Sequence, residues 1–104
     1  MIKWHSRIYL EEKVRTDYDK IRALADEGKC ASGIYFIALS SNPDEQLDIF
    51  SAHMFRSSLE VFPDPVVVGL ASGKEEAEEL VSVMALDALE AVGTVDFRKY
   101  FEEL

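Results

Sequence analysis

Cysteine is almost absent from this chain, whose 104 residues include only Cys30. One cysteine cannot form an internal disulfide bond, and a lone thiol is typical of proteins from reducing compartments. No CxxC pair and no neighbouring histidine accompany it, so we expect Cys30 to be a half-buried structural residue. These features predict a cytoplasmic protein that depends on its hydrophobic core for stability.

Long hydrophobic runs are also missing. The longest uncharged apolar stretch, near residues 33–39, is much shorter than the roughly 20 residues of a membrane-spanning helix, and the first residues lack the apolar segment of a signal peptide. We therefore expect no membrane association. Hydrophobic residues still make up 48% of the chain, which suits a single small domain over residues 1–104.

Basic residues are scarce relative to acidic ones, because 11 Lys and Arg face 20 Asp and Glu and the net charge is −9. Such a surface repels phosphate groups, so nucleic-acid binding is not expected. The charge is uneven, with +2 over residues 1–15 and −7 over residues 75–104. This asymmetry permits head-to-tail attraction between subunits, but a solvated helix face next to a neutral strand is the favoured explanation.

The sequence offers little for catalysis or metal binding. His5 is expected on the solvent side of a strand, and His53 stands five residues after Asp48 and eleven before Asp64, which is not the spacing of a helical metal pair. No GxSxG nucleophile motif is present. We predict no metal site, no cofactor and no catalytic residue, and we favour a protein that is not an enzyme.

Four strands are expected from the hydrophobic pattern. Residues 2–10 alternate between apolar and polar side chains, as in a half-buried edge strand. The apolar runs at residues 33–39 and 66–71 predict buried strands, and residues 47–50 predict an antiparallel partner of the first of them.

Helices are predicted over residues 17–27, over residues 73–92 and over a short C-terminal segment that Thr94 or Asp96 caps. Residues 53–62 fit a short helix or an irregular strand. The resulting order, β-α-β-β-β-α-α, predicts an α+β fold with helices packed on a mixed or mostly antiparallel sheet of about four strands.

The turn between residues 69 and 74 resembles a phosphate-binding loop only at first sight. A P-loop has four residues between its glycines and a Ser or Thr after the lysine, whereas three residues separate Gly69 from Gly73 and Glu75 follows Lys74. Four glutamates in the first two turns of the helix also oppose an anion. Ser72 and Glu75 have the spacing of a capping box. The alternative is a small-anion or small-ligand site at Ser72, Gly73 and Lys74, completed at a subunit interface.

Val83 and Leu86 break the pattern of the long C-terminal helix, since both fall within its polar stripe. Either the last helix or another subunit could cover them. The last helix itself carries more aromatic surface than a small domain easily hides, and such a surplus indicates association. The candidate interface residues are Val83, Leu86, Phe97, Tyr100 and Phe101.

Together these patterns predict a non-enzymatic protein-interaction or regulatory module that forms a homodimer or binds a protein partner. A binding protein or enzyme that uses the turn at residues 72–74 is the alternative.

Overall fold

A mixed four-stranded sheet forms the centre of the protein in the computed structural model, which describes residues 1–29 and 31–104. Cys30 lies outside the described residues. The strands are β1 (Lys3–Leu10), β2 (Tyr35–Leu39), β3 (Leu47–Ser51) and β4 (Val66–Ala71). Their order in the sheet is β1-β4-β2-β3; β1 runs parallel to β4, and β2 is antiparallel to both β3 and β4. The predicted α+β class with a mixed sheet is confirmed.

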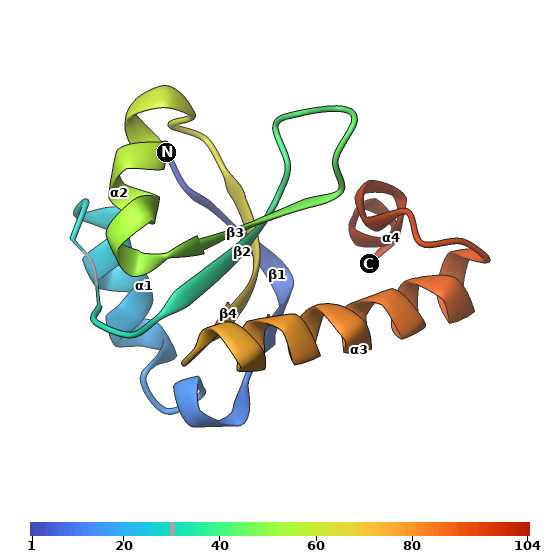
Figure 1. The fold of residues 1–104 in the computed structure, drawn as a ribbon, viewed down its shortest axis with the longest axis horizontal. Helices are drawn as coiled ribbons and strands as arrows, with labels where there is room; N and C mark the ends of the chain where they lie inside the picture. The colour runs from blue at the N-terminus through green and yellow to red at the C-terminus, as the bar shows by residue number, and fades with distance from the viewer. Residues whose placement is uncertain (30) are drawn as a thin grey trace.

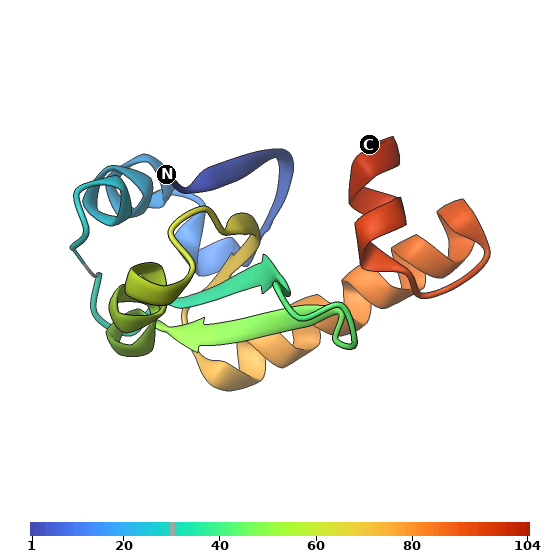
Figure 2. The ribbon, with the colours of Figure 1, turned by 90° about the horizontal axis from the view of Figure 1, so that it is seen from above.

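Helices cover both faces of this sheet (Figures 1 and 2). A short 3-10 turn, η1 (Glu12–Val14), and α1 (Tyr18–Asp26) follow β1, while α2 (Ala52–Val61) joins β3 to β4. The chain ends with α3 (Lys74–Val92) and α4 (Phe97–Glu103). The sequence left residues 53–62 open between a short helix and an irregular strand, and they form most of α2, so the first alternative is the observed one.

The first core lies between the sheet and the pair α1 and α2. Phe55 of α2 stacks on Phe36 of β2 with ring centroids 4.1 Å apart, and both side chains are buried. Ser51 caps α2, because its hydroxyl accepts a hydrogen bond from the N–H group of Met54 at 3.3 Å. Capping and the buried aromatic pair together explain why this ambiguous segment is helical.

The second core lies on the opposite face of the sheet, under α3 and α4. Met84 is fully buried against β4, and Gly69 permits this close approach: a Cβ atom at position 69 would lie 2.7 Å from Cε of Met84. Gly93 then ends α3 in the left-handed conformation, with φ of 79°. Asp96 caps α4 by accepting from the N–H group of Lys99, so one of the two predicted caps is observed.

Strand β1 is irregular, since its register with β4 shifts between Trp4 and Tyr9. Trp4 packs on the first core and Tyr9 on the second. The prediction of an exposed His5 is wrong: its Nε2 donates to the carbonyl oxygen of Phe101 at 2.8 Å, and its ring lies 4.9 Å from the Phe101 ring. Alternation correctly separated the two sides of β1, but α4 returns from the far end of the chain and covers the side that appeared to face solvent.

Candidate interaction surface on helix α3

Three apolar side chains form a row along the outer face of α3. Val83, Leu86 and Leu89 are 48%, 67% and 49% exposed. Residues three apart on a helix are surface neighbours, so these side chains lie one after another. Leu89 was missed by sequence reasoning, although the same spacing of three residues that joined Val83 to Leu86 extends to it. We call these residues the α3 row.

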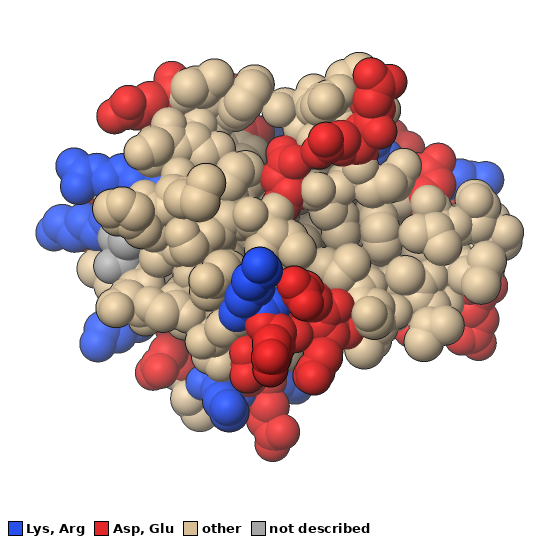
Figure 3. All heavy atoms as spheres, in the orientation of Figure 1, with Lys and Arg blue, Asp and Glu red and all other residues tan. Residues whose placement is uncertain are grey.

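Acidic side chains flank the α3 row along the helix. Glu79 lies one turn before Val83, and Glu90 lies one turn after Leu86. Figure 3 shows acidic side chains gathered where α3 begins, while Lys and Arg side chains lie mainly on the side of α1 and α2. Along α3 itself, the row is thus an apolar strip with carboxylates one turn before Val83 and one turn after Leu86.

The aromatic residues of α4 lie inside the protein. Phe97, Tyr100 and Phe101 are buried in the second core, where α4 packs against α3. They are therefore not surface groups of this chain, and the apolar surplus expected from them is used in folding. Of the five candidate interface residues, only Val83 and Leu86 are exposed, and α4 leaves both uncovered. Their role in an interface stays a prediction.

A groove of about 430 Å³ adjoins the α3 row and shares Val83 with it. Arg7 and Arg15 line it together with apolar side chains of β1 and α3 and with Tyr9 and Tyr100. The hydroxyl of Tyr9 donates to Oδ2 of Asp87 at 2.6 Å and accepts from the hydroxyl of Tyr100 at the same distance. Burial and the hydrogen bond to Asp87 raise the pKa of Tyr9 well above its ordinary value. This network joins β1, α3 and α4 at the base of the groove.

The turn at residues 72–74 contains no capping box. The hydroxyl of Ser72 donates to the Glu11 carboxylate, which also accepts from the Ser72 N–H group at 3.3 Å. This hydroxyl contact is the main cause that lowers the pKa of Glu11. The predicted pairing of Ser72 with Glu75 is wrong, because Glu11, distant in sequence, takes the Ser72 hydroxyl.

Gly73 rather than Ser72 is the N-cap of α3, and it makes no side-chain capping bond. The carboxylate of Glu76 lies against Gly73, where a Cβ atom would have to stand. Lys74 is exposed. The start of α3 is therefore occupied by carboxylates of the chain itself, from Glu11 on one side and Glu76 on the other, which is an unfavourable setting for a bound anion.

Among the residues that the structure describes, no group of three or more His, Cys, Asp or Glu side chains is arranged to hold a metal ion. His53 is exposed in the first turn of α2. Within the same described residues, no helix combines the length and the apolar character needed to cross a membrane.

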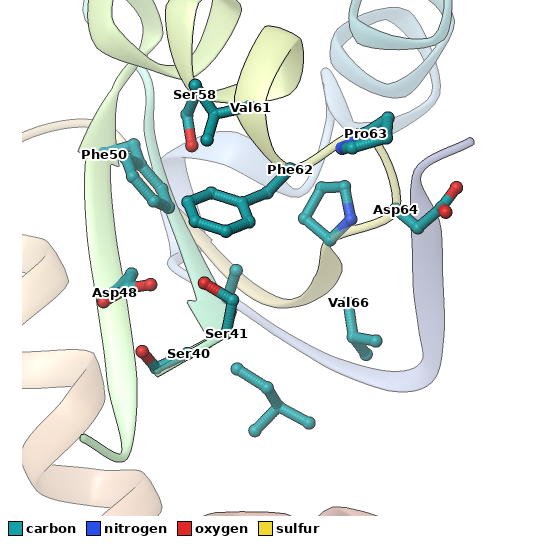
Figure 4. Close-up of a pocket in the computed structure, with 13 residues that line it drawn as sticks. Ser40, Ser41, Asp48, Phe50, Ser58, Val61, Phe62, Pro63, Asp64 and Val66 are labelled. Carbon is teal, nitrogen blue, oxygen red and sulfur yellow. The ribbon is translucent and has the colours of Figure 1, made fainter. Parts of the chain in front are cut away.

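A second hollow, of about 380 Å³, lies beside β3 (Figure 4). Phe50 of β3 and Phe62, the residue that follows α2, place their rings side by side in it, with Ser58 and Val61 of α2 nearby. Asp48 also borders the hollow. Ser58, Val61 and Phe62 come from the segment whose structure the sequence left ambiguous, so sequence reasoning did not bring them together with Asp48 and Phe50 of β3.

A scan against protein-family models found no match for the chain, and searches of curated proteins and of solved structures found none either.

Proposed function

We propose that this protein is a non-enzymatic interaction module that binds a protein partner through the α3 row. The observation that carries the proposal is the exposure of Leu86, at 67%, together with its two apolar neighbours on the same helix. Single exposed apolar residues are ordinary on protein surfaces. A continuous row on one helix, beside a groove, is typical of surfaces that dock another protein.

The surroundings of the row define the partner's chemistry. A complementary surface would be apolar at its centre and basic at its margin, so that its cations face Glu79 and Glu90. Two α3 helices packed antiparallel about a point midway between Val83 and Leu86, so that each Val83 faces the other copy's Leu86, would instead bring Glu79 of one copy opposite Glu90 of the other. Like charges opposed in this way are destabilising, so we favour a different, basic protein over a second copy at this face.

The alternative of a small-anion site at Ser72, Gly73 and Lys74 receives less support. Carboxylates of Glu11 and Glu76 lie at that turn, and an incoming anion would have to displace or face them.

The test has two stages. Protein immobilised through a terminal tag captures candidates from lysate of its source cells, and each candidate is then purified and titrated against wild type and variants. Leu86→Glu should weaken binding by about tenfold or more, because contact would bury most of a leucine side chain, worth about 1.5–3 kcal/mol, and a carboxylate there adds repulsion. Affinity for a basic partner should also fall as salt is raised.

Ser57→Glu is the matched control, since it adds the same charge at an exposed position on α2, away from the row. Its binding should equal that of wild type. A partner that binds Leu86→Glu as tightly as wild type, or loses affinity equally in both variants, would contradict the proposal.

A further inference from the structure

We propose that the edge strand β3 pairs with β3 of a second copy of this chain, joining two four-stranded sheets into one continuous sheet. The two strands would run antiparallel about a two-fold axis at Ile49. This surface is separate from the α3 row, and the inference does not rest on the proposed function.

The two edges of the sheet differ in how well they are protected. Among the described strands, β1 and β3 are the outer ones. Strand β1 is interrupted by a register shift and presents Lys3 and Arg7, both features that discourage pairing. Strand β3 pairs with β2 at each of its 5 residues without a shift, and Asp48 is its sole charged residue. Of these two edges, β3 is the regular and nearly uncharged one.

The ladder between β2 and β3 fixes which backbone groups face outward. The N–H group of Ala52 donates to the carbonyl of Ile34 at 2.8 Å, and the carbonyl of Gln46 accepts from the N–H group of Ser40 at 3.1 Å. Residues 46 and 52 therefore direct their backbone groups inward, and alternation along the strand gives residues 48 and 50 the same direction. The N–H and C=O groups of Ile49 consequently point away from β2, toward the outer edge.

A two-fold axis at Ile49 makes this edge complementary to itself. Ile49 of each copy would exchange both of its outward backbone hydrogen bonds with Ile49 of the second copy, as in the hydrogen-bonded pairs of antiparallel sheets. Asp48 would then stand opposite Phe50 of the second copy rather than opposite another Asp48, which keeps the two carboxylates apart. The Ile49 side chain, 40% exposed in one copy, would meet its equivalent on the face of the sheet that α3 covers.

Helix α2 extends this edge with an uncharged apolar margin. Ser58 and Val61 line the hollow beside Phe50 (Figure 4), so this side of α2 faces β3. Met54, one turn before Ser58, shares that side. Met54 and Val61 are 60% and 68% exposed. In an antiparallel pair both α2 helices lie on the same face of the joined sheet, so their apolar margins would flank the axis.

Charge favours this edge over the α3 row as the place where two copies meet. The charged residues of α2, Arg56 and Glu60, lie about 160° around the helix from Ser58 and away from β3. Two chains of charge −9 repel one another. Contact through an uncharged margin adds the least further repulsion, whereas contact between α3 rows would add opposed glutamates.

Sedimentation velocity across a concentration series, with hydrogen exchange of the Ile49 amide, tests the inference. Wild type should dimerise, and the exchange rate of the Ile49 amide should fall at least tenfold as the dimer fills. Ile49→Pro removes the outward N–H group without removing a bond to β2, and proline is tolerated at such edge positions. We expect it to raise the dimer Kd at least tenfold while circular dichroism stays unchanged.

Further variants separate the possible outcomes. Ile49→Lys places a charge at the axis and should also weaken the dimer, and it decides the matter should the proline variant fail to fold. Leu86→Glu should leave the dimer intact. A wild type that stays monomeric up to about 0.5 mM would overturn the inference. A dimer that persists in Ile49→Lys would also overturn it. So would a dimer that only Leu86→Glu abolishes, because that result would place self-association on α3. None of these results depends on whether a different protein binds the α3 row.

Discussion

The contact between Gly69 of β4 and Met84 of α3 decides which face of α3 packs on the sheet. A double-mutant cycle at positions 69 and 84 tests this contact. Met84 is fully buried, and a Cβ atom at position 69 would lie 2.7 Å from its Cε and 3.1 Å from Cδ1 of Ile37. Gly69→Ala therefore forces a methyl group into occupied space. The inward position of Met84 is also what leaves Leu86, two residues later, on the outside.

The expected energies follow from these contacts. Met84→Ala leaves a cavity and should lower the free energy of unfolding by about 2–5 kcal/mol. Gly69→Ala overpacks the same place and should cost about 1–3 kcal/mol, reduced by the smaller backbone entropy of alanine. In the Met84→Ala background the nearest obstructing atom is gone. Gly69→Ala should therefore cost less there by about 1 kcal/mol or more, a coupling typical of residues in direct contact.

Urea denaturation of wild type, both single variants and the double variant measures the cycle at one protein concentration. Leu86→Ala serves as the control on the same helix. Its side chain is 67% exposed, so only about a third of a leucine's burial energy, roughly 0.5–1 kcal/mol, is at stake. This packing of α3 would be refuted if the changes in unfolding free energy at positions 69 and 84 added to within about 0.5 kcal/mol. It would also be refuted if Leu86→Ala lowered the free energy of unfolding more than Met84→Ala.

Two further predictions concern tyrosine ionisation and the docking of α2. Burial and the hydrogen bond to Asp87 raise the pKa of Tyr9, so neutral Tyr9 stabilises the fold fully below about pH 10, the ordinary tyrosine pKa, and progressively less as pH rises above it. Tyr9→Phe should lower the free energy of unfolding by about 1–2 kcal/mol at pH 8. Above about pH 10 the stability of this variant should fall less steeply with pH than that of wild type. Urea midpoints measured across this pH range check the prediction, and equal slopes for the two proteins would contradict it. Phe55→Ala removes the buried ring that stacks on Phe36 and should lower the urea-derived unfolding free energy by about 3–5 kcal/mol, whereas a loss below about 1 kcal/mol would mean that α2 is not docked there.

Local patterns predicted most of the elements because their causes are local. The buried run at residues 66–71 coincides with β4, and the short link between residues 39 and 47 gave the antiparallel pairing of β2 with β3. Gly93 ends α3 and Asp96 caps α4 as their chemistry requires. Each of these signals depends on residues within a few positions of one another.

The failures share a different cause, which is contact between residues far apart in sequence. His5 faces α4 rather than solvent, since Phe101 returns from the other end of the chain. The Ser72 hydroxyl bonds to Glu11 rather than capping its own helix. The same return of α4 buries Phe97, Tyr100 and Phe101. A helical pattern shows that one face is apolar, but it does not say which element will cover that face.

The acidic surroundings of the α3 row favour different partners at the two proposed surfaces. Glu79 and Glu90 make the row suitable for a basic protein and unsuitable for its own copy, whereas the uncharged margin of β3 and α2 imposes no such selection. Salt should therefore act in opposite directions: screening weakens attraction between a basic partner and the row, but it reduces repulsion between two chains of charge −9 that meet at β3. Val83 of the row lies beside β1, at one edge of the sheet, and the proposed pairing uses β3, at the other edge. Occupation of one surface would therefore leave the other open, and a dimer joined at β3 would present two α3 rows to its partners.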